Sequence, residues 1–287
     1  MEAVTFGGLE EAHTHYEAAG VVVLPVCFDK TSTWLKGSDR GPRAIIDASS
    51  NLELYDIDTG SEVYRHGIYT AEEIRPASSE SLNQAVYEAV KKHFENGKFV
   101  ILLGGEHSVS YGAIKAHLDR SIDMSVLHLD AHTDMRDIYE GNIFSHACVM
   151  ARVRELTTRI TSVGIRSMDS TELKNIDMKR VFLARELEGN DRWIRRVVRQ
   201  LTTQVYLSID LDVFDPGIMP STGTPEPGGL TWYQVTGLLK EVARRRYIVG
   251  FDVVELCPGS NMAPDFLAAK LVYTLLSYIY HYRQDAS

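Results

Sequence analysis

Short apolar runs recur along the chain, and turn residues bound most of them. Between the runs, hydrophobic positions follow the spacing of a helix. A strand of a parallel sheet that is covered on both faces has no polar side, so such runs predict buried strands. We expect strands at Val21–Pro25, Phe99–Leu103, Met124–Leu129, Ile160–Ile165, Val181–Leu183, Gln204–Ile209 and Tyr247–Val254. The expected helices are Ser81–Asn96, His107–Leu118, Arg192–Leu201, Tyr233–Arg244 and a last one from Pro264 to Tyr280.

The alternation of strands and helices predicts an α/β fold, in which a mostly parallel sheet has helices on both faces. No proline-rich or glycine/serine-rich linker and no internal repeat interrupts the series. A length of 287 residues suits one large domain or two small ones, and the unbroken alternation favours a single domain over residues 1–287. Such sheets bind ligands beyond the carboxyl ends of their strands, so we look for chemistry directly after each run.

Composition and charge narrow the classes of function. Hydrophobic residues make up 44% of the chain and charged residues 24%, which is ordinary for a globular protein. A formal net charge of -9 argues against a nucleic-acid partner and is compatible with a cationic small molecule. No signal peptide and no membrane-length apolar run is visible. Cys27, Cys148 and Cys257 suggest no disulfide framework, so we expect a cytoplasmic enzyme or binding protein.

Three expected strand ends carry clusters of histidine and aspartate. The cluster GGEHS follows the strand FVILL, DAHTD follows SVLHL, and SIDLDVFDP contains the end of the strand VYLSI. In DAHTD, the side chains of Asp130, His132 and Asp134 would project to one side of an extended chain. Crowded carboxylates repel one another, and a divalent cation removes that cost. The candidate metal ligands are His107, Asp130, His132, Asp134, Asp210 and Asp212.

Taken one by one, these clusters have other interpretations. A histidine such as His107 is more often a polar turn residue than a ligand, and phosphotransfer enzymes also end strands with aspartates such as Asp210 and Asp212. Taken together, imidazoles and carboxylates in this ratio suit a pair of octahedral ions and favour manganese over zinc. Two ions about 3.5–4 Å apart could hold a bridging water and lower its pKa.

Two further residues are candidates for substrate chemistry. Glu255, in the segment VVELCP after the last strand of the sheet, would clamp a cationic group, although a surface glutamate is an equal alternative. His146 lies in the loop after DAHTD and could move protons, because the ordinary pKa of histidine is near neutrality.

The blocks GGEHS, DAHTD, SIDLDVFDP, STGTPEPGGLTW and VVELCP resemble the ureohydrolase (arginase/agmatinase) superfamily in content and order. The resemblance runs from about Pro25 to the C-terminal helix. It implies a three-layer α/β/α sandwich with a mainly parallel, eight-stranded sheet and two manganese ions per subunit. It also implies a homo-oligomer, either a trimer or a hexamer.

The resemblance also implies a role for each site residue. One manganese ion would be held by His107, Asp130, Asp134 and Asp210, and the other by Asp130, His132, Asp210 and Asp212. Asp134 would also orient a hydroxide that bridges the ions and attacks the guanidinium carbon of a substrate. Glu255 would anchor the guanidinium group. His146 would contact the substrate and pass a proton to the leaving amine, so that the products are urea and an amine.

The loop MRDIYEGNIFSHA and the segment GIRSM resemble agmatinases more than arginases. This resemblance implies hydrolysis of agmatine to urea and putrescine, a step of polyamine and putrescine biosynthesis. Acidic Asp137 and Glu140 near the outer end could favour the free ammonium of agmatine over a carboxylate, although Asp137 is at least as well explained as a solvated loop charge. Asp169 stands where arginases keep an aspartate for the α-amino group, and it would bind the same amine of agmatine. Arg136 would instead favour a carboxylate if it points inward. The alternatives are therefore a guanidinobutyrase, an arginase or a formiminoglutamase.

Two features bear on whether the chain is an active enzyme and on the shape of its pocket. Non-catalytic relatives of such enzymes usually lose metal ligands, and none of the six candidate ligands is missing here. Ala147 stands where many relatives have glycine, which could narrow the pocket.

Overall fold

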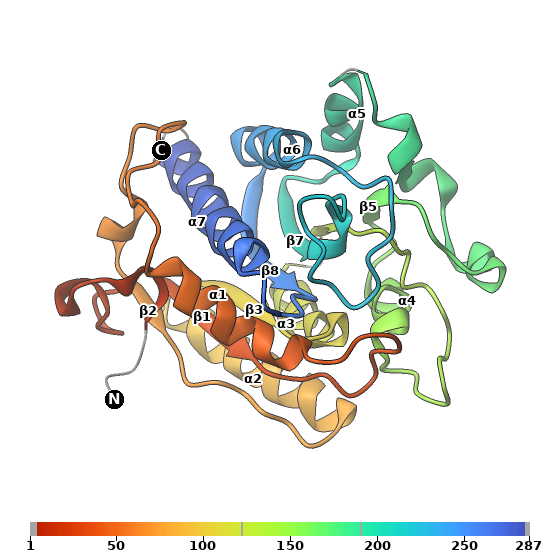
Figure 1. Ribbon diagram of the computed structural model, residues 1–287, viewed down its shortest axis with the longest axis horizontal. Coiled ribbons are helices and arrows are strands. Elements are labelled where there is room, and N and C mark those ends of the chain that lie inside the picture. Colours follow the sequence, from red (N-terminus) through yellow and green to blue (C-terminus); the bar gives the residue numbers. More distant parts are fainter. Residues whose placement is uncertain (1–4, 122, 190, 285–287) are drawn as a thin grey trace.

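The described residues form one eight-stranded sheet in which every strand pairing is parallel. The computed structural model describes residues 5–121, 123–189 and 191–284 (Figure 1). Across the sheet the strands follow the order β2-β1-β3-β8-β7-β4-β5-β6. Their bounds are Val21–Val26 (β1), Ile68–Thr70 (β2), Phe99–Gly104 (β3), Ser125–Leu129 (β4), Ile160–Ile165 (β5), Val181–Leu183 (β6), Gln204–Asp210 (β7) and Tyr247–Val254 (β8).

Helices cover both faces of this sheet. Helices α1, α5, α6 and α7 form one layer, and α2, α3 and α4 form the other (Figure 1). The fold is the three-layer α/β/α sandwich that the sequence predicts. The helix bounds are Gly41–Ser49 (α1), Ser79–Glu95 (α2), Ser110–Arg120 (α3), Val149–Leu156 (α4), Arg192–Gln200 (α5), Trp232–Arg245 (α6) and Ala263–Gln284 (α7). None of these helices is long and apolar enough to span a membrane.

Each central strand supplies side chains to two separate cores. In β3, Ile101 and Leu103 belong to the core under α1, α5, α6 and α7, whereas Val100 and Leu102 belong to the core under α2, α3 and α4. Neighbouring side chains of a strand point to opposite faces, and here both faces are dry. This double burial explains why the strands appear in the sequence as unbroken apolar runs.

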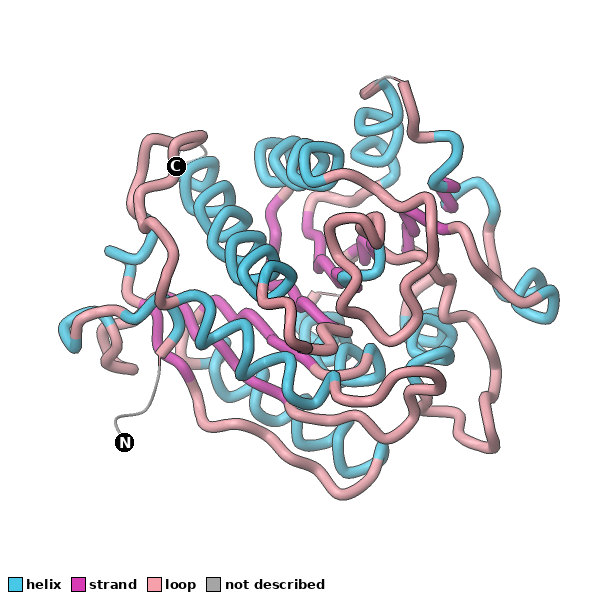
Figure 2. Tube along the Cα trace, in the orientation of Figure 1, coloured by secondary structure: helices cyan, strands magenta, loops and turns pink. Residues whose placement is uncertain are grey.

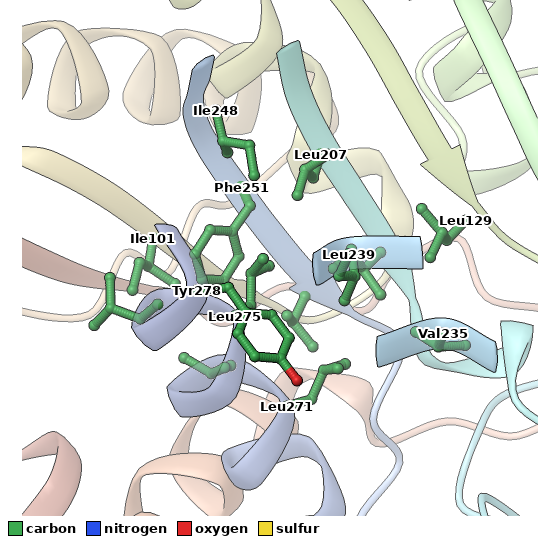
Figure 3. Close-up of a cluster of buried hydrophobic side chains, with 14 of the residues drawn as sticks. Ile101, Leu129, Leu207, Val235, Leu239, Ile248, Phe251, Leu271, Leu275 and Tyr278 are labelled. Carbon is green, nitrogen blue, oxygen red and sulfur yellow. The ribbon is translucent and has the colours of Figure 1, made fainter. Parts of the chain in front are cut away.

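The larger core lies between the middle of the sheet and helices α6 and α7. Figure 3 shows Leu275 and Tyr278 of α7 beside Phe251 of β8, with Leu239 of α6 next to them. The hydroxyl of Tyr278 leaves the apolar cluster and donates a hydrogen bond to Asp58 Oδ2 at 2.6 Å. Tight packing on this face makes the central strands a rigid base for whatever lies at their ends.

Seven strands begin and end within one residue of their predicted bounds, and some other elements differ from the prediction. Strand β2, at the edge of the sheet, is three residues long, which is too short to give a hydrophobic pattern. Helices α1 and α4 were not predicted and have only nine and eight residues. The predicted helix start at His107 is wrong. Residues His107–Val109 form a separate 3-10 turn, and α3 begins at Ser110.

The close approach of two loops explains the second glycine of GGEHS. A side chain on Gly105 would collide with the backbone oxygen of Phe28, in the loop after β1. The same approach allows the Glu106 N–H to donate a hydrogen bond to the Phe28 oxygen at 2.9 Å. Only glycine lets these two chain segments meet at the end of the sheet.

We therefore expect Gly105→Ala to lower the free energy of unfolding by about 3 kcal/mol or more, because the clash is with backbone that cannot turn away. Gly259→Ala is the matched control, since a methyl group there would meet nothing within 4 Å. Urea unfolding of both variants would measure the difference. Equal stability of the two variants would contradict the close approach.

Candidate metal centre

The predicted clusters lie at the carboxyl ends of four strands that are neighbours in the sheet. These strands stand in the order β3-β8-β7-β4, although the chain visits them as β3, β4, β7 and β8. His107 follows β3 in a short turn, Asp130 directly follows β4, Asp210 ends β7 and Glu255 directly follows β8. The crossovers thus bring residues almost 150 positions apart to one edge of the sheet, where parallel sheets bind ligands.

The first group of ligand atoms surrounds the ring nitrogen Nδ1 of His107. Oδ2 of Asp130 and Oδ2 of Asp134 each lie 3.1 Å from this nitrogen, and Oδ2 of Asp210 lies 3.3 Å from it. All four side chains are buried. No described residue accepts a hydrogen bond from Nδ1 in good geometry, even with three oxygens so near. Donor atoms bound at right angles to an ion at about 2.1 Å lie about 3 Å apart, so these residues fit a small divalent cation.

A second group of ligand atoms shares Asp130 with the first. His132 Nδ1 lies 2.9 Å from Asp212 Oδ2 and 3.5 Å from Asp130 Oδ1. Asp130 thus turns one oxygen toward each group, which is the arrangement a bridging carboxylate needs. Oδ1 of Asp210 accepts a hydrogen bond from the Asp212 N–H at 2.8 Å. All six predicted ligands are therefore gathered into two adjoining groups.

The electrostatics of the cluster favour a cation. Burial raises the pKa of Asp210 well above its ordinary value, and the charges of Asp212 and Asp130 raise it further. Burial alone would lower the pKa of His107, but its contacts with Asp130, Asp134 and Asp210 raise this pKa well above the usual range. Both shifts favour the protonated forms of Asp210 and His107, which reduce the repulsion among the carboxylates. A divalent ion would take the place of those protons.

Hydrogen bonds from neighbouring side chains orient the ligands of the first group. These neighbours were not predicted from the sequence. The His107 Nε2–H donates to Ser208 Oγ at 2.9 Å, and the Ser208 hydroxyl donates to the buried Asp252 at 2.8 Å. On β4, His128 Nε2 donates to Asp130 Oδ2 at 2.8 Å. Partners of this kind fix the ring and carboxylate positions of metal ligands. His128 could have been found, because it precedes Asp130 by two residues and so lies on the same side of the strand.

The segment between β7 and α6 is mostly without regular structure (Figure 2), and its residues Gly223 and Thr224 contribute to the wall of the site. Arg166, in the segment GIRSM, holds this loop in place by hydrogen bonds. Its guanidinium donates to the backbone oxygens of Asp212 at 2.6 Å and of Glu226 at 2.8 Å. The fastened loop also brings Glu226 Oε1 to 3.7 Å from His132 Nε2.

Glu255 is a buried residue of the site, which excludes the alternative of a surface glutamate. Its Oε1 accepts a hydrogen bond from the His107 N–H at 2.7 Å. Burial and the nearby charge of Glu106 raise the pKa of Glu255 well above its ordinary value. Glu255 (φ 68°) and Asp134 (φ 53°) both have left-handed backbone conformations, which are costly for residues with a side chain. Strain of this kind gathers at functional sites.

A cavity of about 280 Å³ opens beside the two groups, and His146 and Glu255 both line it. His146 Nδ1 lies 3.1 Å from the hydroxyl of Thr31, and its ring packs edge-on against Tyr139. Burial lowers the pKa of His146, and the charge of Asp134 opposes that shift. A ring that is neutral near neutral pH can both accept and return a proton.

The outer end of the cavity has more carboxylates than cations. Arg136 does point inward, and its guanidinium lies over the ring of Tyr139 at 5.0 Å. Its charge is already paired, with Asp169 Oδ2 at 3.4 Å and Glu172 Oε1 at 3.7 Å. Two carboxylates around one guanidinium leave a net negative charge, which would attract a cationic tail.

Glu140 and Asp137 lie away from this outer end. Glu140 is exposed, on a turn closed by Tyr139 and Asn142, and is not among the residues that line the cavity. Asp137 forms an ion pair with Lys174 at 2.5 Å on the surface. Of the three acidic residues considered for the ammonium end of a substrate, only Asp169 lines the cavity.

The comparison with known proteins identifies the family. Residues 19–277 match the arginase family. The chain belongs to this family. An N(1)-aminopropylagmatine ureohydrolase of Synechocystis sp. is 39% identical over 280 residues, which cover 93% of this chain and 92% of the relative. An agmatinase of Pyrococcus horikoshii is 32% identical over 90% of this chain and 91% of its own length.

Solved structures of the arginase family share the fold. The crystal structure of the agmatine ureohydrolase of Thermoplasma volcanium matches with a TM-score of 0.90 and 33% sequence identity. The match covers 100% of this chain and 98% of that one. The sequence-based assignment to the ureohydrolases and to an arginase-like α/β fold is therefore confirmed.

Loading this arginase-family chain with metal should stabilise it. At a concentration one hundred times its dissociation constant, Mn²⁺ would add about 2.7 kcal/mol, or about 5 °C in Tm. Asp130→Asn should remove most of this gain, because Asp130 lies between both groups. Asp137→Asn, on the exposed loop, is the control and should keep it. Calorimetry of chelator-treated protein with and without Mn²⁺ tests this, and an undiminished gain in Asp130→Asn would contradict the shared carboxylate.

Proposed function

We propose that the chain is an agmatinase that hydrolyses the guanidinium group of agmatine to urea and putrescine. One observation supports this most strongly: the two groups of ligand atoms, Glu255 and His146 surround a single cavity whose outer end is negatively charged. Agmatine carries a guanidinium at one end and an ammonium at the other, so each end of the substrate would meet the matching part of the cavity.

Each side chain would have a separate task in the reaction. Two divalent ions, when bound, would supply an activated water for attack on the guanidinium carbon. Asp134 would orient that water. Glu255 would hold the guanidinium in position, since Oε1 is fixed by the His107 N–H and Oε2 lies on the side of Gly223, which also lines the cavity. His146 would give a proton to the amine nitrogen as its bond to carbon breaks.

The charge at the outer end of the cavity favours agmatine over arginine and guanidinobutyrate. Both alternatives carry a carboxylate at the tail, and the cation that would receive it, Arg136, is already paired with Asp169 and Glu172. A substrate carboxylate would have to displace one of these partners and would be repelled by the other.

N(1)-aminopropylagmatine is a second candidate substrate. The relative from Synechocystis sp., which is 39% identical, is named an N(1)-aminopropylagmatine ureohydrolase. This compound extends the cationic tail by another amine, and the same carboxylates, Asp169 and Glu172, would bind that tail. Its hydrolysis would give urea and the corresponding triamine.

Manganese as the physiological ion, a trimer or hexamer, a cytoplasmic location and a role in polyamine biosynthesis belong to this proposal as predictions. The donor set of imidazole nitrogen and carboxylate oxygen supports manganese over softer metals.

A substrate panel tests the proposal. Manganese-loaded protein should release urea from agmatine or N(1)-aminopropylagmatine with a kcat/KM at least about 100-fold higher than from arginine or guanidinobutyrate, which corresponds to about 2.7 kcal/mol. The ratio of the first two rates chooses between the two candidate substrates. Faster turnover of arginine, or no urea from either amine substrate, would refute the proposal.

Asp169→Asn tests recognition of the tail. Asparagine keeps the hydrogen bonds that residue 169 accepts from Thr171 but loses the charge, so we expect KM for agmatine to rise about 10-fold with little change in kcat. Glu140→Gln removes the same charge from an exposed residue that does not line the cavity, and it should leave KM unchanged. If the two variants behaved alike, the assignment of the tail to Asp169 would be wrong.

A further inference from the structure

Glu106, in GGEHS, is a buried carboxylate that the proposed function does not use. Its side chain is fully buried and accepts four hydrogen bonds. Oε2 accepts from the Thr31 N–H at 2.6 Å and the Ser32 N–H at 3.2 Å, while Oε1 accepts from the Thr31 hydroxyl at 2.5 Å and the Ser108 hydroxyl at 2.7 Å. With four donors aimed at it, this carboxylate acts only as an acceptor.

The Thr31 hydroxyl connects Glu106 to His146. A hydroxyl has one proton to donate and two lone pairs that accept. Thr31 donates its proton to Glu106 and accepts from the His146 backbone N–H at 3.0 Å, which leaves one lone pair for His146 Nδ1 at 3.1 Å. The ring nitrogen must then be the donor. His146 Nδ1 therefore carries a proton in the neutral ring, and Nε2 is left with its lone pair.

We propose that Thr31, acting with Glu106, is a positioning residue that holds His146 in the Nδ1–H tautomer with Nε2 as the proton-transfer atom. This inference rests on the proposed role of His146. The protonated ring gives the Nε2 proton to the amine nitrogen as the carbon–nitrogen bond breaks, and the electron pair of that bond stays on the nitrogen. The ring keeps its Nδ1 proton throughout and regains the Nε2 proton from solvent.

Local geometry supports this role for Thr31. Thr31 lies in the loop after β1, whereas His146 begins the 3-10 turn His146–Cys148 that precedes α4. The Thr31 hydroxyl oxygen thus accepts two hydrogen bonds from His146, one from its backbone N–H and one from the ring that lines the cavity. The Ser145 hydroxyl, with Oγ 3.2 Å from Nδ1, can accept from the same Nδ1–H but can also donate to an unprotonated Nδ1. The preference for this tautomer therefore comes from Thr31, whose only proton is donated to Glu106.

A matched pair of variants tests the proposal. Thr31→Val keeps the shape of the side chain and the backbone N–H that binds Glu106 but removes the hydroxyl, whereas Thr31→Ser keeps the hydroxyl. We expect kcat for agmatine to fall about 10- to 100-fold in Thr31→Val, with KM and bound manganese unchanged, and to stay within about threefold in Thr31→Ser. An aminooxy analogue of agmatine, whose leaving amine is weakly basic and needs less protonation, should lose much less rate in Thr31→Val.

A second measurement does not depend on turnover. Nitrogen-15 NMR of histidine-labelled protein loaded with diamagnetic Mg²⁺ reports which ring nitrogen of His146 is protonated, with His146→Gln to assign the signal. The wild type and Thr31→Ser should show a protonated Nδ1, and Thr31→Val should lose that preference. An unchanged tautomer in Thr31→Val, or a changed tautomer with unchanged kcat, would overturn the proposal. If wild type releases no urea, the proposed function fails, and the tautomer result alone decides whether Thr31 positions the ring.

Discussion

Mutual repulsion among buried carboxylates is the constraint on which this structure depends. Asp130, Asp134, Asp210 and Asp212 lie together at one edge of the sheet with almost no exposure to water. Such a group is costly without positive charge, and the three histidines that contact it, His107, His128 and His132, are fewer than its four carboxylates. The fold supports the cluster because it is attached to the ends of strands whose sides are packed on both faces. The packing energy of two hydrophobic cores offsets a local arrangement that would not form by itself.

The site repeats one device for orienting a histidine. Asp252 acts through Ser208 on His107, and Glu106 acts through Thr31 on His146. In both series of hydrogen bonds, a buried carboxylate accepts the hydroxyl proton. The hydroxyl oxygen therefore accepts a hydrogen bond from the histidine ring. The outcome differs because the rings are reversed. His107 turns Nδ1 toward the carboxylates, while His146 keeps Nδ1 toward the protein and leaves Nε2 free for proton transfer.

The sequence predicts the central strands and the six candidate ligands because the pattern that indicates each of them lies within a short contiguous segment. An apolar run fixes a strand, and DAHTD fixes three ligands through a spacing of two residues. The order of the strands in the sheet cannot be found in this way. Strands β8 and β7 lie between β3 and β4 in the sheet, although both follow β4 along the chain. The orienting residues also escape prediction. Thr31 and Ser208 are single hydroxyl residues whose importance depends on contacts with residues 115 and 101 positions away. Inward-pointing Arg136 suggested a carboxylate substrate, and only its ion pairs in the structure remove that implication.

The most direct test of the account is crystallographic. Anomalous scattering from crystals grown with manganese would locate the ions without any assumption about the substrate. We expect two neighbouring peaks, one among His107, Asp130, Asp134 and Asp210 and the other among Asp130, His132, Asp210 and Asp212. A single peak, or manganese bound elsewhere with these side chains still hydrogen-bonded to one another, would contradict it.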